Sequence, residues 1–158
     1  NAVRQIKKQP PKLAIDVEID LPVDAFLPED YVTDIRAKID FYRRLSKLED
    51  FEEIHQLKEE LIDRFGRPPQ SVEQLLQLAE VRLEAAIWQI TSISLEDRFL
   101  RIQYVNRQRI EQLARNTDGA FRIVDNKSAY LTLPAGLNSD HGMITFVKSV
   151  LHPAGFSS

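Results

Sequence analysis

The 158-residue sequence contains no cysteine. Disulfide bonds, thiolate metal ligands and thiol nucleophiles are therefore excluded, and we expect a reducing, cytoplasmic environment. The sequence also lacks any run approaching the roughly 18 apolar residues of a membrane-spanning helix, and it has no charged-then-apolar stretch of the secretory type. We expect no membrane partner. Because the first residue is Asn1 rather than methionine, we also expect a fragment of a longer protein.

Glycine is scarce and scattered. The five glycines are Gly66, Gly119, Gly136, Gly142 and Gly155. A phosphate-binding loop needs clustered glycines followed by Lys-Ser or Lys-Thr, because backbone amides must surround the phosphates and the lysine must neutralise them. No such motif is present, so we predict no nucleotide cofactor and no motor or kinase activity in this chain.

Histidine is rare, with three residues far apart in the sequence. His55 and Glu59 have the i, i+4 spacing of a helical metal site, but their acidic surroundings favour an exposed ion pair. Ser139, Asp140 and His141 are the residue types of a hydrolase triad. Adjacent positions cannot align a nucleophile, a base and an orienting acid, so helix capping is favoured. The sequence therefore predicts no metal site and no catalytic residues.

The remaining composition is that of one globular domain. Hydrophobic residues make up 43% of the chain, charged residues 28%, and the net charge is −3. A domain of this length buries roughly 70% of its unfolded surface, which is enough for its own core. Residues 1–12 are polar and basic around Pro10 and Pro11 and predict a linker. We expect the domain to span residues 13–152 and a flexible tail to span residues 153–158.

One amphipathic helix, predicted from residue 50 to Gly66, concentrates the negative charge of the chain. Asp50 and Glu53 have the spacing of a capping box, and Gly66 followed by Pro68 and Pro69 ends the helix. On a helical wheel the apolar side carries Ile54, Leu57, Leu61, Ile62 and Phe65, and the opposite side carries Glu49, Glu53, Gln56, Glu60 and Asp63. Residues 49–63 contain seven acidic side chains and one lysine, a net charge of 1 − 7 = −6.

The other elements follow from hydrophobic periodicity. Alternation predicts a strand over residues 13–21, and Tyr31, Ile35, Ile39, Tyr42 and Leu45 predict the apolar face of a helix that ends near Lys47. A third helix is predicted from a Ser71–Gln74 capping box to Trp88. Further predictions are strands at 90–95 and 99–104, a helix capped by Asn106, strands at 121–124 and 129–133, and a last helix capped by Asn138, Ser139 or Asp140. This order indicates a single α+β domain with a small mixed or antiparallel sheet packed against several helices.

Two kinds of binding surface are compatible with the charges. The acidic helix face is either a solvated surface or a docking face for a basic partner. The alternative is an accessory nucleic-acid-binding domain that uses the Arg98–Arg122 region, where arginines alternate with two aromatic residues. Those residues are Arg98, Phe99, Arg101, Tyr104, Arg107, Arg109, Arg115 and Arg122. Acidic residues among them weaken the positive field.

Three motifs carry a family resemblance. Residues 27–32 read Leu-Pro-Glu-Asp-Tyr-Val, residues 41–45 read Phe-Tyr-Arg-Arg-Leu, and residues 59–69 read Glu-Glu-Leu-Ile-Asp-Arg-Phe-Gly-Arg-Pro-Pro. Together they resemble the C-terminal domain of the bacterial transcription-repair coupling factor family (Mfd), over about residues 13–83. Residues 90–152 match that domain in the order of their elements.

The resemblance implies a regulatory domain without catalytic activity. In the family, the parent protein is an ATP-driven DNA translocase that displaces stalled RNA polymerase and recruits the excision-repair protein UvrA. Its C-terminal domain packs against the UvrB-like N-terminal module, masks the UvrA-binding surface and restrains the motor. The contact motif carries over to Glu60 and Asp63 here. Glu53, Gln56 and Glu59 are possible flanking contacts on the same face, and DNA is expected to bind the parent's motor and not this fragment.

Overall fold

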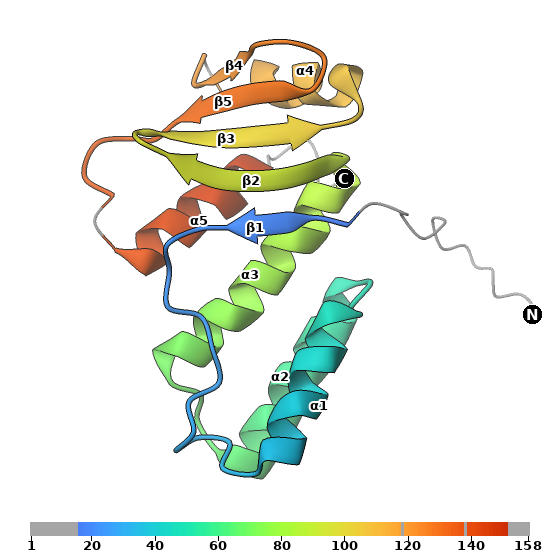
Figure 1. Ribbon diagram of the computed structural model, residues 1–158, viewed down its shortest axis with the longest axis vertical. Coiled ribbons are helices and arrows are strands. Elements are labelled where there is room, and N and C mark those ends of the chain that lie inside the picture. The colour runs from blue at the N-terminus through green and yellow to red at the C-terminus, as the bar shows by residue number, and fades with distance from the viewer. Residues whose placement is uncertain (1–15, 118, 138, 152–158) are drawn as a thin grey trace, which may run out of the picture.

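The computed structural model describes residues 16–117, 119–137 and 139–151 of the protein (Figure 1). Within these residues five helices and five strands form one α+β domain. Their order is β1 (Glu18–Asp20), α1 (Ile35–Ser46), α2 (Phe51–Phe65), α3 (Gln70–Ile87), β2 (Ile90–Glu96), β3 (Phe99–Tyr104), α4 (Arg107–Arg115), β4 (Phe121–Ile123), β5 (Ser128–Thr132) and α5 (Asp140–Leu151). The predicted linker (residues 1–12) and tail (residues 153–158) lie outside the described residues.

The sheet is mixed, with strand order β1-β2-β3-β5-β4. Only the edge strand β1 is parallel to its neighbour, β2, and the other pairs are antiparallel. A tight turn joins β2 to β3, and Asp97 adopts a φ of +57° in it. Helices α3, α4 and α5 cover one face of the sheet, so the other face is open (Figure 1). The predicted fold class is therefore confirmed.

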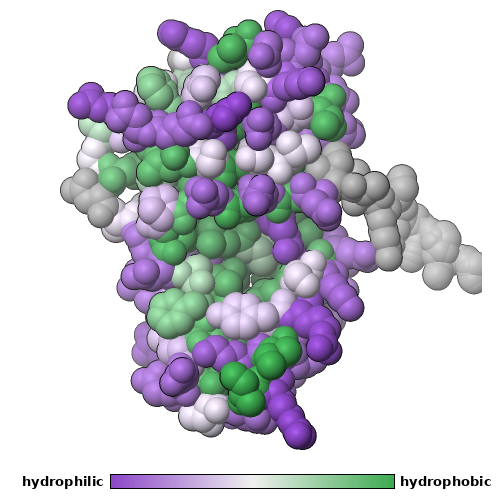
Figure 2. Space-filling model, viewed as in Figure 1, coloured by the Kyte–Doolittle hydropathy of each residue, from purple (hydrophilic) through white to green (hydrophobic). Residues whose placement is uncertain are grey.

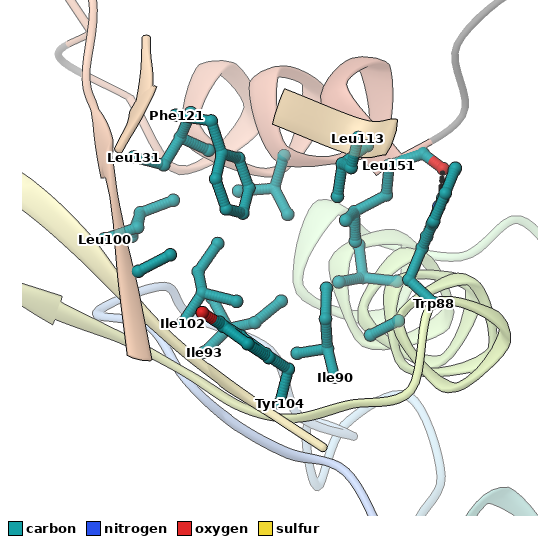
Figure 3. Close-up of a cluster of buried hydrophobic side chains, with 14 of the residues drawn as sticks. Trp88, Ile90, Ile93, Leu100, Ile102, Tyr104, Leu113, Phe121, Leu131 and Leu151 are labelled. Atoms are coloured by element: carbon teal, nitrogen blue, oxygen red, sulfur yellow. Dashed lines mark hydrogen bonds between the residues drawn. The ribbon is translucent and has the colours of Figure 1, made fainter. Parts of the chain in front are cut away.

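Two hydrophobic clusters share α3. The larger one fills the space between the sheet and helices α3, α4 and α5 (Figure 3). There the indole Nε1 of Trp88 donates a hydrogen bond of 2.6 Å to the backbone carbonyl of Leu151, which ties the end of α3 to the end of α5. The smaller cluster joins α1, α2 and the first half of α3, with Leu27 and Val32 from the preceding loop. The α1–α2 hairpin therefore forms, with the first half of α3, a lobe with a separate core.

Helix ends follow the predicted capping chemistry in α2, α4 and α5. The carboxylate of Asp50 accepts from the backbone N–H of Glu53 in a complete capping box, and α2 ends at Gly66 with a φ of +89°. Asn106 caps α4. Of the three candidates for α5, Ser139 accepts a hydrogen bond of 2.9 Å from the backbone N–H of Gly142, whereas Asn138 lies outside the described residues.

The predicted capping box of α3 is wrong. The helix begins at Gln70 after Pro69, which caps it without a side-chain hydrogen bond. Ser71 therefore lies inside the first turn. Gln74 points inward, is buried, and its amide nitrogen donates to the backbone carbonyl of Asp24. The backbone carbonyl of Pro69 accepts hydrogen bonds from the N–H groups of Val72 and Glu73, so the first turn closes without a serine cap.

The predicted apolar face of α1 is wrong for Ile35, Ile39 and Tyr42 and right for Leu45. The helix begins at Ile35 and buries Ala37, Phe41 and Leu45, so its inner side is centred on Phe41. Ile35 and Ile39, which the periodicity placed inside, are 64% and 52% exposed. In α2, Ile62 is likewise exposed. Along the described chain, no helix is long and apolar enough to cross a membrane.

Candidate protein-docking face

The outward side of α2 carries all five residues predicted to bind a partner. Ile54, Leu57 and Leu61 are buried and fix the rotation of the helix about its axis. As a result Glu53, Gln56, Glu59 and Asp63 are exposed and Glu60 is partly buried. We name these five residues the acidic face. Residues three or four apart are neighbours on a helix, so the face is continuous along α2.

Glu60 has two arginine partners within the domain. Its two carboxylate oxygens accept hydrogen bonds of 2.9 and 2.7 Å from Nη1 and Nη2 of Arg44 on α1, and Nη1 of Arg64 adds a bond of 3.1 Å. The hydrogen bonds from Arg44, helped by Arg64, lower the pKa of Glu60 from 4.5 to about 2, although partial burial opposes this shift. Glu60 is therefore ionised at neutral pH, and it joins α1 to α2.

The other four residues differ in what they offer to a partner. One carboxylate oxygen of Glu53 accepts from the backbone N–H groups of Glu49 and Asp50, so this side chain serves the helix cap. Glu59 lies 3.0 Å from the imidazole of His55. Within the described part of the chain, Asp63 and Gln56 have no hydrogen bond or ion pair. Asp63 is thus the carboxylate on this face with the greatest freedom to accept hydrogen bonds.

Sequence reasoning missed Arg44 and Arg64. The i, i+4 spacing of Glu60 and Arg64 is a readable signal for an ion pair on a helix. Arg44 is sixteen positions from Glu60, and their contact depends on how α1 packs beside α2. Both guanidinium groups lie over the buried ring of Phe41, with Cζ atoms 5.3 and 5.4 Å from its centroid. The two arginines therefore have positions fixed by the core as well as by Glu60.

The arginine-rich region does not form one strip. Tyr104 is buried, and its hydroxyl donates to the backbone carbonyl of Asp125. Arg107 on α4 binds Glu111 and Asn126, and Arg109 donates to the carbonyl of Ile87. On the open face of the sheet, Arg101 of β3 forms an ion pair with Glu96. Arg101 and Arg122 are the two neighbours of Tyr130 in the sheet, on β3 and β4. The predicted nucleic-acid residues therefore divide between a helix, the open sheet face and the core.

The acidic face has no metal centre within the described structure, and a groove lies on another part of the domain. Among the described residues, no group of three or more His, Cys, Asp or Glu side chains is arranged to hold a metal ion. An open groove of about 480 Å³ lies between α3 and α5, beside Phe51 at the start of α2. The ion pair between Lys148 and Glu80 is part of its wall. No residue of the acidic face lines the groove.

Comparison with known proteins identifies the family. The model of the TRCF domain family matches residues 21–114. The chain belongs to the transcription-repair coupling factor family. It is 32% identical over 141 residues to the transcription-repair-coupling factor of Staphylococcus aureus (strain USA300), and 26% identical over 155 residues to that of Myxococcus xanthus. These alignments cover 89% and 95% of the chain but 12% and 13% of the relatives.

A solved structure shows the same fold. The crystal structure of the C-terminal domain of a transcription-repair coupling factor matches with a TM-score of 0.71 and 24% identity, covering 87% of this chain and 93% of that one. The resemblance seen in the three sequence motifs is thus confirmed. This TRCF-family chain spans about an eighth of the length of the relatives that it matches, and its fold is that of the solved C-terminal domain.

Proposed function

We propose that this chain is a non-catalytic regulatory domain of a transcription-repair coupling factor. Its acidic face docks on the UvrB-like N-terminal module of the same parent protein, masks the surface that UvrA uses and restrains the DNA translocase. The observation that carries the proposal is the position of Asp63. This carboxylate is exposed, has no partner among the described residues, and lies one helical turn from the contact residue Glu60.

We infer different parts for Glu60 and Asp63. Asp63 keeps its oxygens available for a bidentate hydrogen bond from an arginine of the partner, the arrangement that such pairs favour. Glu60 is already paired with Arg44 and Arg64, so it offers its remaining lone pairs at the edge of an ordered cluster. A partner that approaches Glu60 also meets these two internal guanidinium groups. We therefore assign the larger share of the electrostatic attraction to Asp63.

A contact of this kind suits a reversible restraint. The acidic face is polar and exposed, so docking buries little apolar surface and depends on charges that salt screens. Contacts between domains of one chain are generally moderate in strength, and domain motion is the default where the interface is small and polar. The docked domain would therefore open when the parent protein engages a stalled polymerase.

The direct test is Asp63→Arg in the full-length parent protein, with UvrA binding as the readout. Reversing this charge should release the domain and raise UvrA affinity about tenfold, the change expected when a charge contact of about 1.4 kcal/mol is lost. The 158-residue chain carrying Asp63→Arg should unfold at the same denaturant concentration as the wild type. Unchanged UvrA affinity would contradict the proposal.

Glu111→Arg is the matched control. Glu111 lies on α4, is partly exposed, and takes part in an ion pair with Arg107 whose side chains are both nearly half exposed. Reversing its charge changes the net charge of the domain by the same amount but leaves the acidic face intact. UvrA affinity should therefore stay at the wild-type value, and an equal rise in both variants would point to net charge and not to docking.

A further inference from the structure

Four large apolar side chains form an exposed strip on the hairpin lobe. We name Phe26, Ile35, Ile39 and Tyr42 the apolar strip, and their exposed fractions are 47%, 64%, 52% and 38%. The spacings of four and three residues place Ile35, Ile39 and Tyr42 on one side of α1. The hydroxyl of Tyr42 accepts a hydrogen bond of 2.9 Å from the backbone N–H of Leu27, which holds the loop beside the helix. Apolar atoms gather over α1 in the lower half of Figure 2.

The strip is a second apolar side on a helix whose first apolar side is already buried. Ala37, Phe41 and Leu45 form the side of α1 that packs into the lobe. An amphipathic surface helix needs one apolar side, and its opposite side is normally polar. Exposed apolar patches rimmed by polar residues mark contact surfaces on folded domains. The periodic apolar residues of α1 therefore point to burial by a segment outside the described chain.

Basic residues flank the strip. On the helical wheel of α1, Arg36 and Arg43 lie along one border and Lys38 lies along the other. None of the three side chains has an ion pair within the part of the chain that the structure describes. The two acidic residues of this segment are engaged elsewhere, because Asp34 caps the helix and Asp40 pairs with Arg44 on the opposite side. The complementary partner is an apolar ridge with acidic flanks.

We propose that the apolar strip is a permanent interdomain contact, covered by an apolar segment with acidic flanks from elsewhere in the same parent chain. The relatives are about seven times as long as this chain, so most of the parent lies outside the structure. The contact is separate from the proposed docking of α2. The strip lies on the side of α1 opposite Arg44, and Arg44 is the residue that binds Glu60.

The two surfaces differ in the physics of their contacts. A polar contact such as the acidic face exchanges its partner for water at little cost, and salt weakens it. Uncovering the strip would expose apolar surface to water, and salt does not offset that penalty. The strip therefore stays covered when the acidic face is released, and the partner segment moves together with this domain.

The absence of cysteine gives a clean test by thiol footprinting. Ile39→Cys places a reporter thiol at the centre of the strip, and Lys127→Cys places a control thiol in the exposed turn between β4 and β5. Each substitution is made in the 158-residue chain and in the full-length parent. Alkylation by N-ethylmaleimide is then followed at the labelled peptide by mass spectrometry, so that cysteines elsewhere in the parent do not interfere.

In the full-length parent the thiol at position 39 should react at least about tenfold more slowly than in the 158-residue chain, as for a contact closed at least ten times more often than open. The control thiol at position 127 should react equally in both. Protection at position 39 should persist when Asp63→Arg is added, even where UvrA affinity rises.

Three results would overturn the proposal. Equal reaction at position 39 in both proteins would show an uncovered strip. Protection lost on adding Asp63→Arg would make the strip part of the reversible contact. Protection that appears in the 158-residue chain and grows with its concentration would identify a second copy as the occupant. Each of these results leaves the docking role of Asp63 to be judged by UvrA affinity alone.

Discussion

Helices α1 and α2 are antiparallel neighbours in one hairpin, yet they expose opposite kinds of surface. The exposed side of α1 is apolar with basic borders, whereas that of α2 is acidic and polar. The ion pair between Arg44 and Glu60 joins the two helices on the side of α1 opposite the apolar strip. If both proposed contacts exist, the contact of α2 opens easily and that of α1 resists opening, because charge and apolar area respond differently to water.

The largest expected effect is on the free energy of unfolding, and it separates the buried apolar side of α1 from the exposed apolar strip. Phe41 is fully buried and meets Phe65 edge to face, with ring centroids 6.0 Å apart. Phe41→Ala should lower the free energy of unfolding of the 158-residue chain by about 3 to 5 kcal/mol, because it leaves a cavity. Ile39→Ala should change it by less than about 0.5 kcal/mol. Urea denaturation checks both values, and a large loss for Ile39→Ala would place the strip inside the folded core.

A smaller effect, on how the free energy of unfolding depends on pH, separates Glu60 from Asp63 on α2. The pKa of Glu60 is about 2 in the folded protein against 4.5 without partners. The stabilisation of the folded domain by ionised Glu60 is therefore complete above pH 4.5 and is lost as the pH falls through 2. Its size is about 1 kcal/mol, since the side chain is 34% exposed and water screens the pair.

Glu60→Gln tests this assignment. The variant should be less stable than the wild type by about 1 kcal/mol at pH 7, and the difference should shrink towards zero near pH 2. Asp63→Asn is the matched control and should track the wild type at every pH, because Asp63 has no partner among the described residues. Urea denaturation from pH 7 to pH 2 measures both. A Glu60→Gln difference that does not vary with pH would remove the electrostatic explanation.

The sequence predicted the fold well where a local signal decides the structure. Asp50 and Glu53 set the start of α2, Gly66 sets its end, and alternation sets the β2–β3 hairpin, because each depends on residues a few positions apart. It failed for the inner side of α1. Two apolar stripes share that helix, and only the packing of α2 and α3 shows that Phe41, and not Ile39, faces inward.

In the candidate site, too, the sequence predicts what local spacing decides and misses what tertiary packing decides. The wheel of α2 correctly predicted that Glu60 and Asp63 share the outer side. The wheel did not distinguish the paired carboxylate from the unpaired one, however, because the Arg44 that pairs with Glu60 lies on another helix. The hidden difference between these two carboxylates is therefore a tertiary property, and Asp63 becomes the centre of the proposed contact only once the packing is known.

The central claim is that the acidic face of α2 binds the UvrB-like module directly. Titration calorimetry of the 158-residue chain with that isolated module should give a dissociation constant of about micromolar order, as for a small polar interface. Asp63→Arg should weaken it at least about tenfold, and Ile39→Glu should leave it unchanged. Binding by Asp63→Arg as tight as that of the wild type, or loss of binding in Ile39→Glu, would contradict the account.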